Sequence, residues 1–118
     1  MKERMKRLQK KLTEEELDAV LITNPENRYY LTGFTGTAGA ILLTTERGFL
    51  ITDFRYTEQA GNQTEEFEII ELNKDIIESI NDILQEDGTK KLGIEAKTVN
   101  YYQYGKYEEK FKDIKRIT

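Results

Sequence analysis

Residues 40–53 read AILLTTERGFLITD and predict a β-hairpin. Two runs of apolar and β-branched residues, 40–44 and 49–53, are each long enough to form a short strand. The four residues between them run from Thr45 to Gly48, are polar and end in glycine, which is typical of a tight hairpin turn. The hairpin supplies two antiparallel neighbours from which the rest of a sheet can be placed.

Strands and helices alternate on both sides of this hairpin. The predicted elements are, in order, helix 2–12, strand 18–23, a helical turn over 25–31, the hairpin strands 40–44 and 49–53, helix 55–60, strand 67–72, helix 76–84, strand 91–96, helix 100–111 and a possible edge strand 114–117. Such alternation predicts an α/β domain of three layers, in which helices flank a mixed sheet of five to six strands. We expect one domain over residues 1–118.

Residues with strong positional preferences mark the predicted helix ends. Pro25 suits the first position of a helical turn, and Gly88 suits a position just past a helix. Asp53 and Asn100 are expected to cap the helices that follow them. Thr13 and Glu16 have capping-box spacing, which predicts that a new helical turn begins at Thr13.

The composition excludes several classes of function. The chain has 118 residues with no histidine and no cysteine, so Ser-His and Cys-His nucleophiles, HExxH zinc sites and disulfides cannot form within it. The net charge of −4 argues against a nucleic-acid partner. The basic start, MKERMKRLQKKL, lacks a signal-peptide core, and no apolar run approaches the ~20 residues that span a bilayer. We therefore expect no membrane association and a cytoplasmic location.

The segment from Gly33 to Gly39 is rich in glycine and hydroxyl side chains. A loop of this kind could cradle a phosphate, but neither the Gly-x-Gly-x-x-Gly spacing nor a P-loop ending is present. We interpret it as a tight turn that leads into the hairpin.

A second segment, 52–60, reads TDFRYTEQA and follows the second hairpin strand. Arg55 offers a planar fork that matches a carboxylate, and Phe54 and Tyr56 could wall an apolar pocket. The alternative is that Asp53 caps the following helix and pairs with Arg55 within the domain. The residues alone leave both interpretations open.

Other polar clusters favour structural roles. Glu95 lies at the end of a predicted strand and is interpreted as structural. The basic face of helix 2–12 could bind an acidic partner, but we interpret it as a solvated helix surface. No group of acids has the spacing of a calcium loop, so we predict no metal ligand and no catalytic residue in this chain.

Several stretches together resemble the amino-terminal domain of creatinase/prolidase-type Xaa-Pro peptidases, the family of aminopeptidase P and prolidase. They are NRYYLTGFTGTAG at 27–39, LITDFRYTEQA at 50–60, LGIE at 92–95, RLQ at 7–9 and LDAVLIT at 17–23. The match covers nearly the whole chain, and the two central motifs together are specific.

The resemblance implies a two-domain metallopeptidase that hydrolyses peptide bonds preceding proline. Its carboxy-terminal pita-bread domain, absent from this chain, would bind two divalent ions, expected to be manganese, through two aspartates, a histidine and two glutamates. This chain would supply subunit contacts and part of the substrate-pocket wall. Its partners would be its own carboxy-terminal domain, further copies in a homodimer or higher homo-oligomer, and Xaa-Pro peptides.

The resemblance also implies a role for Arg55. In creatinase-like relatives the matching position reaches a neighbouring subunit and binds the substrate carboxylate. In those relatives the apolar residue that accompanies the arginine stands at the position matching Asp53, one before Phe54. That aromatic contact is therefore not carried over to Phe54. The substrate-proximal or interface candidates are Arg55, Asp53, Phe54, Tyr56 and Phe34.

Two functions remain open at this point. The chain is either the non-catalytic domain of such a peptidase or a freestanding protein- or peptide-binding module of the same descent. The sequence does not separate an aminopeptidase from a dipeptidase.

Overall fold

The computed structural model describes residues 2–36, 38–72, 75–95, 97, 99–111 and 114–117. Its elements are α1 (Lys2–Glu14), β1 (Ala19–Ile22), α2 (Pro25–Thr32), β2 (Ala40–Thr44), β3 (Gly48–Thr52), α3 (Thr57–Gln63), β4 (Glu68–Glu71), α4 (Ile76–Asp87), β5 (Leu92–Glu95), α5 (Tyr101–Lys110) and β6 (Ile114–Ile117). Every predicted element is present, so the expected order of helices and strands is confirmed.

The six strands form one mixed sheet in the order β4-β3-β2-β1-β5-β6. The predicted hairpin pairs β2 with β3, and β1 joins β2, both in antiparallel fashion. The pairs β1–β5, β3–β4 and β5–β6 are parallel. The predicted α/β fold with a mixed sheet is therefore confirmed.

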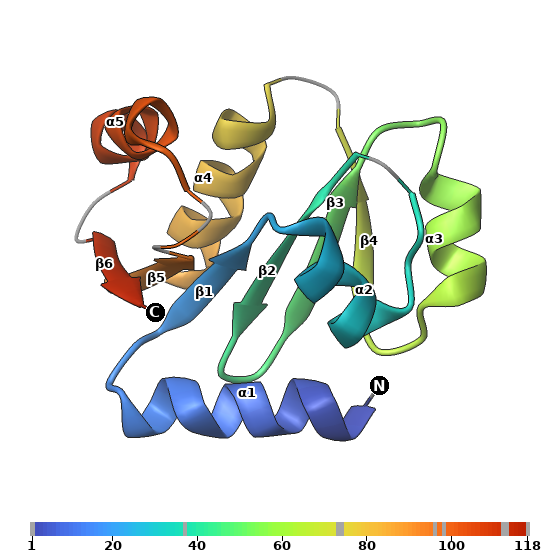
Figure 1. Cartoon of the computed structure of the whole chain (residues 1–118), viewed down its shortest axis with the longest axis horizontal. Helices are drawn as coiled ribbons and strands as arrows, with labels where there is room; N and C mark the ends of the chain where they lie inside the picture. Colours follow the sequence, from blue (N-terminus) through green and yellow to red (C-terminus); the bar gives the residue numbers. More distant parts are fainter. Residues whose placement is uncertain are drawn as a thin grey trace.

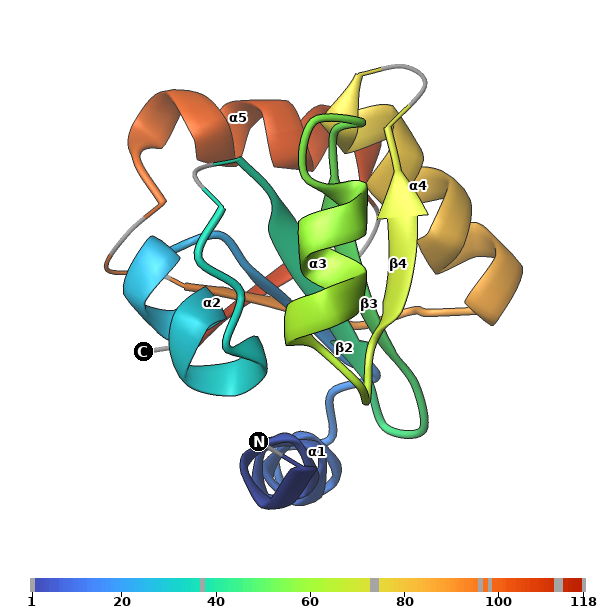
Figure 2. The ribbon, with the colours of Figure 1, turned by 90° about the vertical axis from the view of Figure 1, so that its right-hand side faces the viewer.

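Helices cover both faces of the sheet and make the three layers (Figures 1 and 2). Alternate strand residues point to opposite faces, as the pleat requires. Val20, Ile41 and Leu50 pack with residues of α1, α2 and α3 on one face. Leu21, Leu42 and Ile51 pack with residues of α4 and α5 on the other. All six of these side chains are buried, so the central strands β1 to β3 are apolar on both sides.

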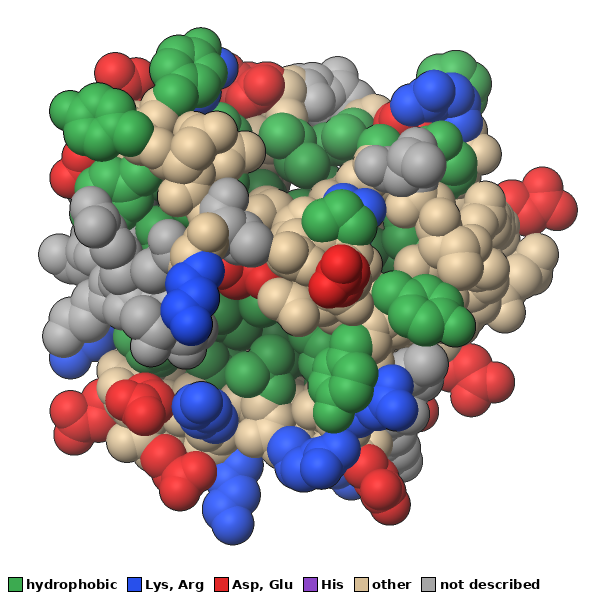
Figure 3. Space-filling view, viewed as in Figure 1, with side chains coloured by type: hydrophobic (Ala, Val, Ile, Leu, Met, Phe, Trp, Pro, Cys, Tyr) green, Lys and Arg blue, Asp and Glu red, His purple; other side chains and the backbone are tan. Residues whose placement is uncertain are grey.

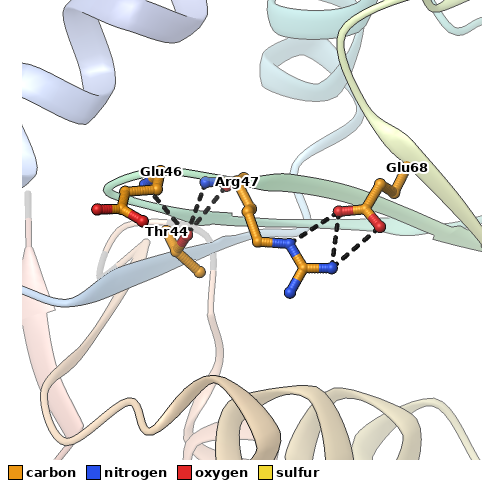
Figure 4. Close-up of polar contacts among 4 residues, drawn as sticks. All are labelled: Thr44, Glu46, Arg47 and Glu68. Atoms are coloured by element: carbon orange, nitrogen blue, oxygen red, sulfur yellow. Dashed lines mark hydrogen bonds and ion pairs between the residues drawn. The ribbon is translucent and has the colours of Figure 1, made fainter.

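The hairpin turn is held by side chains as well as by the backbone (Figure 4). The Thr44 hydroxyl accepts hydrogen bonds from the backbone N–H groups of Glu46 and Arg47 at 3.3 and 2.8 Å. Arg47 donates from Nε and Nη2 to the two carboxylate oxygens of Glu68, both at 3.0 Å. This fork ties the turn to the edge strand β4.

Three of the predicted helix ends are confirmed. Pro25 occupies the first turn of α2, and Gly88 ends α4 with φ 77°. Asn100 caps α5 through a reciprocal capping box with Gln103. In each case a residue type with one strong local preference decides the position.

Two predictions about caps are wrong. Thr13 starts no new turn, because α1 continues to Glu14 and then ends: the Leu17 N–H bonds to the Leu12 carbonyl at 2.8 Å while Glu16 adopts φ 60°. Asp53 does not cap α3, which begins at Thr57 after a Tyr56 cap without a side-chain bond. The Asp53 carboxylate instead accepts from the Arg55 N–H.

Candidate functional site

The glycine-rich segment that leads into the hairpin and the TDFRYTEQA segment that follows it meet at the carboxyl end of β3. The Thr52 hydroxyl donates to the Ala38 carbonyl at 2.7 Å. The rings of Phe34 and Tyr56 meet edge to face, with centroids 6.1 Å apart. Gln63 of α3 accepts a hydrogen bond from the Thr35 N–H at 3.1 Å. Residues 33–36, 38–39 and 53–63 therefore form one region, which we call the β3-end surface.

Asp53 and Arg55 form a two-pronged ion pair on this surface. Arg55 Nε donates to Asp53 Oδ1 at 3.1 Å, and Nη2 donates to Oδ2 at 2.8 Å. The Arg55 backbone N–H also donates to Oδ1, at 3.0 Å. These hydrogen bonds from Arg55 hold the pKa of the Asp53 carboxyl below its usual range, and the same contact raises the pKa of Arg55. Of the two interpretations that the sequence leaves open, the structure shows the pairing of Asp53 with Arg55 within the domain, without the helix cap.

The aromatic neighbours of the pair differ in exposure. Phe54 is 74% exposed, although a phenylalanine of a monomeric domain is usually covered. Tyr56 is partly buried, and the Arg55 guanidinium lies 5.1 Å from the centre of its ring. The turn from Asp53 to Tyr56 thus presents a charged fork and an uncovered aromatic ring to the outside.

Phe34 differs from the other four candidates because it is buried. Only 2% of it is exposed, and it packs in the core between the sheet and α1–α3. Its ring lies so close to Gly36 that a Cβ there would come within 2.1 Å of the ring Cζ. Phe34 offers no surface to a ligand of this domain, and its contact with Tyr56 joins that residue to the core.

Arg28 is the residue of this region that sequence reasoning missed. It is only 5% exposed, and its Nη1 and Nη2 donate to the carbonyls of Gly39 and Gly36 at 2.5 and 3.3 Å. Burial lowers the pKa of Arg28, and the Glu95 carboxylate opposes that shift. Arg28 shares the inward face of α2 with Leu31 and Thr32, at positions i, i+3 and i+4, and that spacing is the signal that could have revealed it.

The contacts of Arg28 support the interpretation of residues 33–39 as a tight turn. The loop carbonyls face a guanidinium inside the domain, and Gly33 ends α2 with φ 77°. Thr37 lies outside the described residues. Glu95 is structural as predicted: it accepts hydrogen bonds from the N–H groups of Thr23 and Asn24 at 2.7 and 3.0 Å.

The described residues contain no cluster of three or more His, Cys, Asp or Glu side chains that could hold a metal ion. Within the same residues, every helix is too short or too polar to cross a lipid bilayer. Basic and acidic side chains both lie along the edge of the molecule where α1 lies (Figure 3), while Met5 and Leu12 of that helix are buried. The apolar face of α1 is therefore already used by the core.

Known proteins resemble this chain in sequence and in fold. The family profile described as Creatinase/Prolidase N-terminal domain matches residues 4–118. The "Uncharacterized peptidase YqhT" of Bacillus subtilis (strain 168) is 40% identical over 101 residues, which are 86% of this chain and 29% of that protein.

Two solved structures extend the likeness to the whole domain. The "Xaa-Pro dipeptidase from Bacillus anthracis" has a TM-score of 0.94 at 36% identity, covering 98% of this chain and 33% of that one. The "aminopeptidase P, XAA-pro aminopeptidase from Streptococcus thermophilus" has a TM-score of 0.92 at 32% identity, covering 99% of this chain and 91% of that one. The chain spans 29% and 33% of the Bacillus subtilis and Bacillus anthracis proteins.

Proposed function

The chain belongs to the creatinase/prolidase N-terminal domain family of Xaa-Pro peptidases, and we propose that it is the non-catalytic part of a longer metallopeptidase that hydrolyses peptide bonds preceding proline. The observation that carries this proposal is the extent of the matches. The family profile covers residues 4–118, yet the chain spans only 29% of its Bacillus subtilis relative. The remaining length of such a protein is where we place the catalytic domain.

The residues of this chain do not fit a dinuclear metal centre. The sequence has no histidine, and the described part holds no group of three carboxylates close enough to bind one ion. We therefore assign the two divalent ions, expected to be manganese, to the carboxy-terminal domain of the full-length protein. No catalytic step is assigned to any of the 118 residues of this chain.

We assign this domain a part of the substrate-pocket wall. The support is the β3-end surface, where Phe54 is uncovered and the Arg55 side chain is 60% exposed. Both residues project from a short turn that is anchored on β3 and on the buried Phe34. A rigid turn that carries an exposed cation and an exposed ring suits contact with a peptide held by another domain or a neighbouring subunit.

The test is Arg55→Ala in the full-length protein. We expect kcat/KM for Xaa-Pro peptides to fall about tenfold or more, because a charge-assisted contact to the substrate is lost. The melting temperature should stay unchanged, since the Arg55 side chain bonds to Asp53 of its own exposed turn. Arg47→Ala is the matched control: it removes the same kind of fork at the other end of β3 and should leave kinetics unchanged.

The result that contradicts this proposal is an Arg55→Ala protein that melts several degrees lower yet keeps normal kinetics. Arg55 would then serve the fold alone. The 118-residue chain by itself is expected to cleave no Xaa-Pro peptide, with or without added manganese.

We further propose that the full-length protein is a homodimer or higher homo-oligomer in the cytoplasm. The absence of cysteine from all 118 residues agrees with a reducing compartment. Sedimentation of the full-length protein would test the assembly, and a monomer at micromolar concentration would contradict it.

A further inference from the structure

The large hydrophobic side chains that stay exposed in the described part of the chain all belong to segments at one edge of the sheet. β1 and β3 both run antiparallel to β2, and β5 and β6 run parallel to β1, so the carboxyl ends of these four strands share that edge. α2 follows β1 directly, the turn of Phe54 follows β3, and α5 is the next helix after β5. These three segments carry the exposed set, which is Tyr29, Tyr30, Phe54, Tyr101 and Tyr102. We call this side of the domain the carboxyl edge.

The carboxyl edge forms one side of the molecule. The end of β6, α2 and the start of α5 lie toward the viewer in Figure 1 and on the left in Figure 2. Figure 3 shows the same side, and hydrophobic side chains stand out at several places on it. The hairpin turn at the opposite edge has only polar and charged exposed residues, Thr45 to Arg47.

The tyrosines of α5 divide into a covered and an uncovered pair. Tyr104 and Tyr107 pack against the core between the sheet and α4. Tyr101 and Tyr102 begin the helix and are 93% and 70% exposed. Tyrosine is enriched at protein–protein interfaces because its ring is apolar, its hydroxyl group can form a hydrogen bond and its side chain loses little entropy on contact. An uncovered pair of this kind suits a partner surface.

Cations hold two of the exposed rings in place. The Arg4 guanidinium lies 4.2 Å from the centre of the Tyr30 ring, and the Lys106 ammonium lies 4.7 Å from the centre of the Tyr102 ring. A ring that is already oriented loses less freedom when a partner covers it.

The place where the rest of a full-length protein would attach identifies the partner. The matched profile is that of an N-terminal domain and reaches residue 118, so in the protein that we propose the remaining chain follows β6 at the carboxyl edge. The chain spans 29% of its Bacillus subtilis relative, so most of such a protein lies beyond this domain. A domain tethered at this edge has an effective concentration of about a millimolar, which a free second copy at micromolar concentration does not match.

We propose that the carboxyl edge is the docking surface for the catalytic domain of the same polypeptide, with Tyr101 and Tyr102 of α5 and Tyr29 and Tyr30 of α2 as its apolar anchors. Because the β3-end surface lies at the same edge, a domain docked there also faces that surface. The inference rests on the proposed function and adds to it the surface through which the two domains are joined.

The first experiment is a photo-crosslink in the full-length protein. Benzoylphenylalanine in place of Tyr101 attacks C–H bonds of whatever covers it when it is illuminated. We expect a product with the mass of one chain, in which position 101 is joined to a peptide of the catalytic domain. The matched control has the same residue in place of Glu46, which is exposed in the hairpin turn at the opposite edge, and should give no such product.

Two results of the crosslink overturn the proposal. A product with the mass of two chains would place a neighbouring subunit on the carboxyl edge. No product at position 101 would show that the edge is uncovered.

The second experiment compares one variant in two lengths of protein. Tyr101→Ser combined with Tyr102→Ser should leave the melting temperature of the 118-residue chain nearly unchanged, because both side chains are exposed there. The same variant should lower the melting temperature of the full-length protein by several degrees, because anchors of the interface are lost. Arg47→Ala should affect both proteins alike, since Arg47 bonds to Glu68 of its own domain.

Equal shifts of the tyrosine variant in the two proteins would also overturn the docking surface. The proposed function has its own test in the kinetics of Arg55→Ala. If that variant has normal kinetics while position 101 crosslinks to the catalytic domain, the pocket wall fails and the docking surface stands. If Arg55→Ala lowers kcat/KM while position 101 gives no crosslink, the docking surface fails and the pocket wall stands.

Discussion

Gly36→Ala should destabilise the domain because the new methyl group has no room. A Cβ built at Gly36 lies 2.1 Å from Cζ of Phe34 and 2.7 and 2.8 Å from the two Cε atoms. Carbon atoms in contact prefer about 3.5–4.0 Å, so the overlap exceeds about 1 Å. Phe34 cannot move aside easily, since it is 2% exposed and packs edge-on against Tyr56.

The magnitude follows from this overlap. Overpacking a well-filled core typically costs about 1–3 kcal/mol, and a conflict with the atoms of a buried ring belongs at the upper end. For a domain of this length, a loss of about 3 kcal/mol lowers the melting temperature by about 10 °C. Thermal melting and urea unfolding of the 118-residue chain would both measure it.

Gly105→Ala in α5 is the matched control. A Cβ there meets nothing within 4 Å, and the residue lies inside a helix, where alanine is more stable than glycine by about 0.5–1 kcal/mol. The same substitution should therefore have opposite signs at the two positions.

A double-mutant cycle separates steric overlap from other causes. Phe34→Leu removes the ring atoms that meet the Gly36 methyl group, so the double variant should be more stable than the sum of the single effects predicts. Stability of Gly36→Ala within about 0.5 kcal/mol of the wild type, or additivity within that range, would refute the reasoning.

Three further predictions concern other parts of the domain. Gly88→Ala should cost about 1–2 kcal/mol in a thermal melt, although its Cβ meets nothing within 4 Å, because φ is 77°; no loss would contradict the cap. Burial, and secondarily Glu95, raises the pKa of Tyr107 above its usual value. The stabilisation of the folded domain by the neutral Tyr107 phenol is therefore complete below about pH 10 and is lost as the pH rises through the pKa of the folded state. Alkaline melting should accordingly fall more steeply for the wild type than for Tyr107→Phe, and equal slopes would contradict this. Arg28→Met should lower the urea midpoint by the equivalent of about 2–4 kcal/mol, because two loop carbonyls lose a charged donor, and Arg28→Lys should restore less than half.

Local signals predicted the elements of this fold well where one residue type has one strong preference. Pro25 and Asn100 begin helices, and Gly88 ends one, because fixed φ, a capping side chain and freedom for positive φ act over a single turn. Each of the two wrong cap predictions has its own local reason. The Asp53 carboxylate accepts a hydrogen bond from the Arg55 N–H of its own turn. Thr13 lies within the last turn of α1, and the chain after that turn is held by the buried Leu17.

The candidate site was predictable in part. The motifs pointed to Asp53, Phe54, Arg55 and Tyr56, and the sequence left open whether Asp53 and Arg55 pair or bind a ligand. The structure shows the pair and, in addition, that the Arg55 side chain stays 60% exposed. It also separates Phe34 from the group by burying it, which spacing along the chain could not reveal.

The sequence by itself determined the order of helices and strands, the apolar central strands and the lack of imidazole and thiol chemistry, because these depend on residue types and on periodicities of two and 3.6 residues. Only the tertiary structure decided that Arg28 is buried beneath the loop of Gly36 and Gly39, and that Phe34 contacts Tyr56. Such contacts join side chains from elements brought together by the sheet order. Their energies depend on distance in space, and distance along the chain does not specify it.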